Sequence, residues 1–177
     1  IPHIHTYHTI YEDYTHYLKI PGNTGFKGAI RRFSRRCCEK ADMVIVPTEK
    51  VEKLLRNYRV DKKIRVIPSG INLNKFLKPD SVKTDELVKK YNLSGKNVLI
   101  YIGRISKEKG IAEVIDYFKR LSIRDDTVML VIVGDGPEMT ELKKQSEHCG
   151  LENRIVFTGM VSWGEVENYY AMGNIFV

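Results

Sequence analysis

The sequence predicts an α/β protein whose strands form parallel sheets. Short apolar runs, such as Val98–Ile102 and Val128–Val133, alternate with longer segments in which apolar residues recur every three or four positions. The runs have the length and composition of buried strands, and the longer segments have the period of amphipathic helices. Alternation of strand and helix implies parallel strands joined by crossover helices. With 177 residues, the chain can form one large domain or two small ones.

The opening segment, IPHIHTYHTIYEDYTHYL, is dense in histidine and tyrosine. Alternation from His3 to His8 predicts a short strand that ends in a loop. Together with His5 and His16 these residues invite the interpretation of a zinc site, but no cysteine or helical histidine pair accompanies them. We therefore expect an aromatic patch with hydrogen-bonded histidines, and no metal site.

A basic helix is predicted around residues 26–41. Its apolar residues recur at helical spacing: Phe26, Ile30, Phe33, Cys37 and Ala41. Six basic side chains lie between them: Lys27, Arg31, Arg32, Arg35, Arg36 and Lys40. With one acidic residue, Glu39, the segment carries a net charge of +5, out of +7 for the chain. Such a helix lies on anionic lipid, where each basic residue contributes about 1 kcal/mol, or packs its apolar stripe inward; both can hold at once.

The following segment repeats the pattern of strand and helix. The expected elements are a strand over 41–48, a helix over Glu49–Tyr58 and a strand over Lys63–Pro68. Thr48 is the expected N-cap of the helix, since its hydroxyl can accept a hydrogen bond from a first-turn amide. Pro68-Ser69-Gly70 then breaks the pattern, and residues 71–79 show no clear period. A new helix is expected from Ser81.

A junction of strand and helix stands out in the second half of the chain. The strand Val98–Ile102 ends in Gly103-Arg104, and after a short polar loop a helix begins at Lys109-Gly110. The unpaired amides and the positive dipole end of such a helix favour an anion above the strand. Arg104 and Lys109 add two positive charges, so the junction predicts a phosphate, or a diphosphate. The alternative is that both are ordinary solvated loop residues.

Two more strand ends are expected at the same edge of the sheet. The strand Val128–Val133 is followed by Gly134-Asp135-Gly136-Pro137 and a helix over Glu138–His148, and the strand Ile155–Phe157 by the loop 158–161. Glycines here permit close approach of the backbone to a ligand, with a tight turn without a ligand as the alternative. Because the loop that begins at Gly134 would lie beside Gly103, we expect it to contact the ligand.

The last residues predict a short helix and one more strand. Trp163 is expected to begin or cap a helix that runs through Met172, or to pack in the core, with a stacking role left open. Gly173–Val177 begins a further strand.

Composition limits the class of partner. The charge of +7 favours acidic partners, and no nucleic-acid recognition motif is present. Cys37, Cys38 and Cys149 lack metal-ligand spacing, so we expect a reducing compartment rather than a disulfide framework. No apolar run approaches the roughly 20 residues that span a bilayer. Since the sequence begins at Ile1 without a methionine and stops at Val177 in an apolar segment, we expect it to be a fragment.

Several segments, in this order, resemble the retaining nucleotide-sugar glycosyltransferases of the glycosyltransferase-B fold. They are VIPSGINLNKF at 66–76, Gly103-Arg104 with Lys109-Gly110, VIVGDGPEMTELKK at 131–144 and RIVFTGMVS at 154–162. The run His5-Thr6-Tyr7-His8-Thr9 followed by Tyr11-Glu12 resembles, more narrowly, the 1,2-diacylglycerol glucosyltransferase branch. The similarity covers most of the chain.

The resemblance implies two Rossmann-like domains with parallel sheets. Residues 1–70 would be the C-terminal part of an acceptor- or membrane-facing domain, residues 71–80 the interdomain linker, and residues 81–177 the nucleotide-sugar-binding domain, truncated at its C-terminal end. In the family a pair of glutamates binds ribose and helps to position the sugar, and it would follow Val177. We therefore expect this chain to bind donor weakly and to be inactive by itself.

The resemblance also implies roles for single residues. The catalytic groups would be His8 against the donor sugar, with His5 as the reserve, and Arg104 and Lys109 on the diphosphate. The donor-binding residues would be Gly103, Arg104, Lys109, Gly110, Gly134, Gly136 and Val161, the last near uracil. The acceptor or membrane side would carry His5, Glu12, Arg31, Arg32, Arg35 and Arg36.

The implied activity is metal-independent, retaining transfer of a hexose from UDP-glucose to a membrane lipid such as diacylglycerol. No cofactor is expected, because the nucleotide sugar is a substrate. The enzyme would be cytoplasmic, peripheral on the inner face of the membrane, with an anionic membrane surface and no nucleic acid as partner. The alternatives are a polysaccharide, glycoprotein or phosphatidylinositol acceptor, or a nucleotide-binding module without transfer activity.

Overall fold

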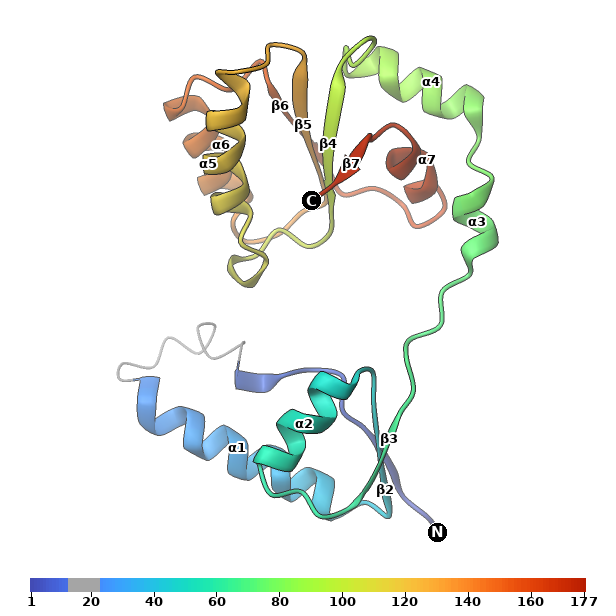
Figure 1. Cartoon of the computed structure of the whole chain (residues 1–177), viewed down its shortest axis with the longest axis vertical. Helices are drawn as coiled ribbons and strands as arrows, with labels where there is room; N and C mark the ends of the chain where they lie inside the picture. The colour runs from blue at the N-terminus through green and yellow to red at the C-terminus, as the bar shows by residue number, and fades with distance from the viewer. Residues whose placement is uncertain (13–22) are drawn as a thin grey trace. The chain divides into compact units, whose positions relative to one another are not determined.

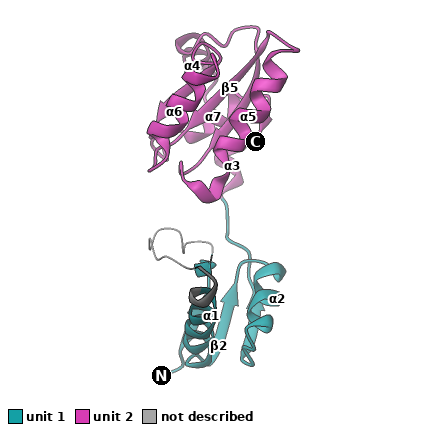
Figure 2. Ribbon diagram, turned by 90° about the vertical axis from the view of Figure 1, so that its left-hand side faces the viewer, with its two compact units in different colours: residues 1–71 teal, residues 72–177 magenta. Residues whose placement is uncertain are grey.

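The computed structural model describes residues 1–12 and 23–177. Its chain forms two compact units, residues 1–71 and residues 72–177, which Figure 2 shows in different colours. Each unit has a parallel sheet of its own. His16 of the predicted aromatic patch lies outside the described residues.

Unit 1 is built on a three-stranded sheet. Its elements are β1 (Ile4–Thr6), α1 (Asn23–Glu39), β2 (Met43–Val46), α2 (Glu49–Asn57) and β3 (Lys63–Val66). The strands pair in parallel in the order β1-β2-β3, which confirms the parallel sheet predicted from the alternation of strand and helix. Thr48 is the N-cap of α2, as predicted, and its side chain accepts a hydrogen bond from the Val51 amide at 3.3 Å.

The side of α1 that packs into unit 1 differs from the predicted stripe. Ser34 and Cys38 are fully buried, whereas Phe33 is 58% exposed and Cys37 is half-buried. The buried hydroxyl of Tyr7 donates a hydrogen bond to Ser34 Oγ at 3.1 Å. A buried phenol needs such a partner, which an apolar residue cannot supply. Of the two alternatives for the apolar stripe, inward packing is therefore wrong for Phe33.

Unit 2 is a four-stranded parallel sheet covered by helices on both faces. Its elements are α3 (Leu73–Leu77), α4 (Ser81–Lys90), β4 (Asn97–Ile102), the 3-10 helix η2 (Lys107–Lys109), α5 (Ile111–Ser122), β5 (Val128–Val133), α6 (Met139–His148), β6 (Ile155–Gly159), α7 (Val166–Ala171) and β7 (Ile175–Phe176). The strand order is β6-β5-β4-β7. Figure 1 shows α5 and α6 on one side of this sheet and α4 and α7 on the other.

Strand β5 lies at the centre of the core of unit 2. All six of its residues are buried, because each face of the strand meets a helical layer. Leu130 and Ile132 pack in the cluster that contains Phe118 of α5, and Val131 packs in the cluster that contains Tyr169 of α7. A continuous apolar run predicted this strand because no residue of it faces water.

The predicted linker over residues 71–80 is more ordered than the sequence indicated. Residues 72–80 belong to unit 2 and contain α3, whose N-cap is Asn72. Near its end, the backbone amide of Asp80 donates a hydrogen bond to the side chain of Asn168 at 2.9 Å. The segment has no amphipathic period because it is held by contacts with α7 rather than by an apolar face of its own.

Among the described helices, none is both long enough and apolar enough to cross a bilayer.

The two neighbouring cysteines of α1 test how this helix is rotated. Burial, with smaller effects of Cys37 and Glu39, raises the pKa of the Cys38 thiol to about 11. Since the thiolate is the reactive form, a Cys38 that stays protonated at pH 8 reacts slowly. We expect a maleimide to label Cys37 in the native protein and to label Cys38 only after unfolding, as read by tandem mass spectrometry.

Because Cys38 is fully buried, its labelling should stay low as the pH is raised until the protein unfolds. Native labelling of Cys38 ahead of Cys37 would contradict this rotation of α1 and would restore the predicted stripe.

Candidate functional site

The carboxyl ends of β4, β5 and β6 lie at one edge of the sheet in unit 2. Strand β4 has β5 on one side and β7 on the other, so the direction of the strand order reverses at β4. In open parallel sheets, ligands bind outside the carboxyl ends of the strands at such a reversal. The predicted residues Gly103, Arg104, Gly134 and Val161 all follow these strands closely in the chain.

Backbone hydrogen bonds join the three loops that follow these strands. We call these loops, residues 103–105, 134–138 and 159–161, the loop edge. The amide of Gly103 donates to the carbonyl of Val133, and the amide of Gly134 to that of Gly159, both at 3.0 Å. The amide of Ile105 donates to the Asp135 carbonyl, also at 3.0 Å. The loop edge is thus a continuation of the sheet rather than a set of separate loops.

The glycines after β5 allow the loops after β4 and β5 to lie this close together. A Cβ on Gly134 would lie 1.9 Å from the carbonyl oxygen of Gly103, and a Cβ on Gly136 would lie 2.0 Å from that of Ile105. Real Cβ atoms do not come so close to backbone, so only glycine fits. The sequence predicted close approach to a ligand at these glycines. The structure shows their close approach to the loop after β4, and their contact with a ligand stays a prediction.

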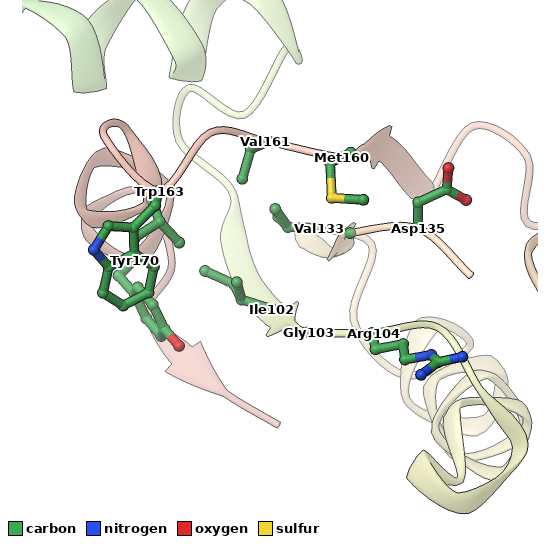
Figure 3. A pocket seen from close by; sticks show the side chains of 11 residues that line it. Ile102, Gly103, Arg104, Val133, Asp135, Met160, Val161, Trp163 and Tyr170 are labelled. Carbon is green, nitrogen blue, oxygen red and sulfur yellow. The ribbon is translucent and has the colours of Figure 1, made fainter. Parts of the chain in front are cut away.

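A pocket of about 540 Å³ opens at the loop edge, within the size range of small-molecule sites. It is lined by Ile102, Gly103, Arg104, Val133, Gly134, Asp135, Met160, Val161, Trp163, Val166 and Tyr170. Figure 3 shows Trp163 and Tyr170 at one end and Arg104 and Asp135 at the other. The pocket therefore has an aromatic, apolar end and a charged end.

The backbone at Arg104 is fixed from below by Tyr101. The hydroxyl of Tyr101 donates a hydrogen bond to the Arg104 carbonyl at 2.9 Å. Burial and, less strongly, the charge of Glu108 raise the pKa of Tyr101, so the phenol keeps its proton and its role as donor. The Arg104 side chain itself is exposed.

Helix α5 begins seven residues after Arg104. Its N-cap is Gly110, in the left-handed conformation (φ 64°) that glycine adopts without strain. Because a glycine cap has no side chain to accept hydrogen bonds, the first-turn amides of this 12-residue helix stay suited to an anion. Lys109 is exposed just before the cap. Neither Lys109 nor Gly110 is among the described residues that line the pocket.

The prediction for Trp163 is wrong. The sequence indicated a capping or core residue, but the indole is 72% exposed and α7 begins only at Val166. Its ring lines the pocket and meets Phe76 edge to face, with ring centroids 6.1 Å apart. The lining residues Tyr170 and Asp135 were also missed as site residues. Asp135 lies inside the glycine-rich motif and could have been singled out there, whereas no local pattern distinguishes Tyr170.

Unit 1 presents His8 just beyond the carboxyl end of β1. Tyr7 is buried and its amide donates to the Ile45 carbonyl at 2.8 Å, so the chain is fixed up to this point. The next residue, His8, is exposed. His5 is half-buried within β1, and its ring lies edge to face with that of Tyr7 at 6.4 Å. The structure thus offers His8 rather than His5 to a ligand.

Two residues predicted for the acceptor side pair with each other. Arg31 Nε donates to Glu12 Oε1 at 2.5 Å, and the guanidinium lies 5.8 Å from the centroid of the Tyr58 ring. Burial and then the hydrogen bond with Glu12 raise the pKa of Tyr58. These contacts join the loop after β1 to α1 and α2. Arg32, Arg35 and Arg36 are exposed on α1.

Within residues 1–12 and 23–177, no three His, Cys, Asp or Glu side chains are grouped so that they could hold a metal ion.

Two family models match the chain. The model described as glycosyl transferases group 1 matches residues 83–177, and that described as glycosyltransferase family 4 matches residues 1–75. Since the first model alone covers more than half of the chain, this chain belongs to the group 1 glycosyltransferases. The family inferred from the linked motifs is therefore confirmed.

Curated relatives match over all or most of the chain. The alpha-monoglucosyldiacylglycerol synthase of Streptococcus pneumoniae is 38% identical over 100% of this chain and 41% of its own length. The enzyme of the same name from Acholeplasma laidlawii is 31% identical over 100% of this chain and 46% of its own length. A GDP-mannose-dependent alpha-(1-6)-phosphatidylinositol monomannoside mannosyltransferase of Mycobacterium tuberculosis is 29% identical over 64% of this chain and 29% of its own length. The chain thus spans less than half the length of these relatives.

Solved structures confirm the predicted fold class. Anabaena Alr3699/HepE in complex with UDP and glucose matches 99% of this chain and 45% of its own, with a TM-score of 0.79 and 20% identity. Sucrose-phosphate synthase from Thermosynechococcus elongatus matches 98% of this chain and 43% of its own, with a TM-score of 0.76 and 22% identity. At these identities the similarity establishes the Rossmann-like glycosyltransferase-B architecture.

Gly136→Ala tests the packing of the loop edge. Its methyl group would lie 2.0 Å from the Ile105 carbonyl oxygen, so the two loops must separate. We expect unit 2 to lose about 2 kcal/mol of stability. Urea unfolding can be followed by the fluorescence of Trp163, the single tryptophan of the chain.

Gly164→Ala is the matched control, since the nearest atom to its added methyl would be Ser162 Oγ at 3.7 Å, an ordinary contact. Equal stability of the two variants would contradict the close packing of the loop edge.

Proposed function

We propose that this chain carries the donor site of a hexosyltransferase. The enzyme would move a hexose from a nucleotide diphosphate, UDP-glucose in the first place, to the hydroxyl of a membrane lipid such as diacylglycerol. The observation that carries the proposal is the two-ended pocket at the loop edge. The names of two relatives, both alpha-monoglucosyldiacylglycerol synthases, support the lipid acceptor.

The apolar end of the pocket suits a nucleotide base. The rings of Trp163 and Tyr170 offer flat apolar surface, and Val161 lies between this end and the sheet. Base stacking on aromatic side chains contributes about 1–3 kcal/mol per base. In this proposal, backbone groups around Val161 hold the uracil edge.

The charged end suits a diphosphate. Arg104 and Lys109 follow the end of β4, and the uncapped first turn of α5 adds oriented amides. When the bond between the sugar C1 and the phosphate oxygen breaks, negative charge grows on the diphosphate. Positive groups held in place before the reaction stabilise that charge in the transition state. We propose that these groups act in place of a metal ion, so that no cofactor is required.

The sugar would be transferred with retention. The lipid oxygen forms the new bond to C1 on the face that the diphosphate leaves, and its proton passes to a phosphate oxygen of the departing UDP. In this scheme His8, exposed after β1, orients the sugar and is not a nucleophile. Gly103 and Gly134 shape the floor of the pocket.

Helix α1 would bring the enzyme to its acceptor. Phe33 is exposed together with Arg32 and Arg36, and Arg36 lies one turn from the phenyl ring. An exposed aromatic residue among cations suits the interface of an anionic bilayer. We propose peripheral attachment to the cytoplasmic face of the membrane, with no nucleic acid as partner.

The test is a transfer assay with the full-length protein, labelled UDP-glucose and vesicles that contain diacylglycerol and an anionic lipid. We expect label in the lipid fraction. In the double variant Arg104→Ala, Lys109→Ala the rate should fall by about a hundredfold or more, because the charge on the leaving group loses its stabilisation.

The control variant Lys119→Ala, Arg124→Ala removes the same charge at the other end of α5, where both side chains are exposed. Unchanged transfer by the first variant would contradict the roles of Arg104 and Lys109. Label transferred from GDP-mannose, or only to a polysaccharide, glycoprotein or phosphatidylinositol, would replace the donor or the acceptor named here. Nucleotide binding without any transfer would favour a binding module.

A further inference from the structure

The aromatic wall of the pocket is supported from outside by α3. The ring of Phe76 meets the pocket residues Trp163 and Tyr170 edge to face, with centroid distances of 6.1 and 5.5 Å. Figure 1 shows α3 next to α7, although the two helices are far apart in the sequence. Two segments therefore build the wall. Helix α7 and the loop before it line the pocket, and α3 packs behind them.

Lys75 of α3 makes three contacts at this place. Its ammonium group lies 4.7 Å from the centroid of the Trp163 ring and donates a hydrogen bond to the Trp163 carbonyl. It also lies 3.1 Å from Glu167 Oε2 on α7. The Lys75 side chain is 22% exposed and that of Glu167 is 14% exposed. A cation–π contact and an ion pair gain strength when they are shielded from water in this way.

The ion pair persists at neutral pH. Burial works to raise the pKa of Glu167, but a hydrogen bond from its own backbone and the contact with Lys75 outweigh this and hold the pKa below its ordinary value. Glu167 is therefore ionised, and Lys75 faces a carboxylate, an indole and a carbonyl oxygen at once.

The contacts of Lys75 join the loop that carries Trp163 to helix α7. Neither of these segments is held firmly by its own local contacts. Trp163 belongs to the loop after β6 and is 72% exposed, so few other contacts orient its ring. Helix α7 has only six residues, too few to be stable without tertiary contacts. Lys75 binds the loop through Trp163 and the helix through Glu167, and the same helix carries the lining residues Val166 and Tyr170.

We propose that Lys75 is a positioning residue for the nucleotide: it holds Trp163 and α7 in place as the wall of the pocket. The inference rests on the proposed function of that pocket. Since coupling between two events is reciprocal, nucleotide binding must in turn stabilise the docking of α3. Helix α3 is the first element of unit 2 after the connection from unit 1. The helix that ends this connection is therefore also the helix that supports the pocket wall.

The experiment uses the chain with UDP as the probe and three variants. Lys75→Met removes the charge, Lys75→Arg keeps it, and Lys78→Met removes a neighbouring exposed charge at the C-cap of α3. For Lys75→Met we expect UDP affinity to fall by at least about fivefold. We also expect a shift in the emission of Trp163. Lys75→Arg should restore both, and Lys78→Met should resemble the wild type.

Hydrogen exchange separates positioning from a general loss of stability. UDP should slow exchange of the α3 amides in the wild type and in Lys75→Arg, but not in Lys75→Met, while the amides of β5 stay protected in all.

Equal UDP affinity in Lys75→Met and the wild type would overturn this inference alone. If Lys75→Met does not fold, Lys75→Arg and Glu167→Gln carry the test: wild-type affinity and α3 protection in Glu167→Gln would overturn it. A wild-type chain that does not bind UDP would contradict the proposed function, and the inference with it.

Discussion

The architecture of unit 2 depends on the contact between the loops after β4 and β5, where the backbones lie too close for a side chain to fit between them. Gly134 and Gly136 let the chain after β5 lie directly on the backbone after β4, and hydrogen bonds from Gly103 and Ile105 hold the two together. Any Cβ at these glycines would separate the loops. Together with the hydrogen bond from Gly134 to Gly159, this contact makes the ends of three strands one continuous floor, on which the pocket opens.

The two ends of the pocket are held in place by different contacts. Its charged end is built close to the sheet, by Arg104 after β4 and Asp135 after β5. Its aromatic end is built by a loop and a six-residue helix, which depend on Lys75 and Phe76 of α3. The charged end depends on residues close to the strand ends, whereas the aromatic end depends on α3, which is far away in the chain. A change in α3 should therefore alter base binding more than diphosphate binding.

The fold and the place of Arg104 at the end of β4 could be predicted from the sequence because their signals are local. A buried strand such as β5 is a continuous apolar run, and a helix start after Gly110 follows from a short motif. The failures have the opposite origin. Ser34 is buried because it pairs with Tyr7, and Trp163 is held by Lys75, 88 residues earlier. No periodicity records such pairs, so the rotation of α1, the helix α3 and the wall of the pocket required the structure.

The central claim is that the loop edge binds the nucleotide of a sugar donor. The most direct measurement is an NMR titration of the chain with UDP up to millimolar concentration, with NADH as the control ligand. The account predicts that UDP alone shifts the amides of Gly103, Gly134 and Val161, and that Arg104→Ala with Lys109→Ala weakens the response. Shifts confined to unit 1, or equal shifts with NADH, would contradict it.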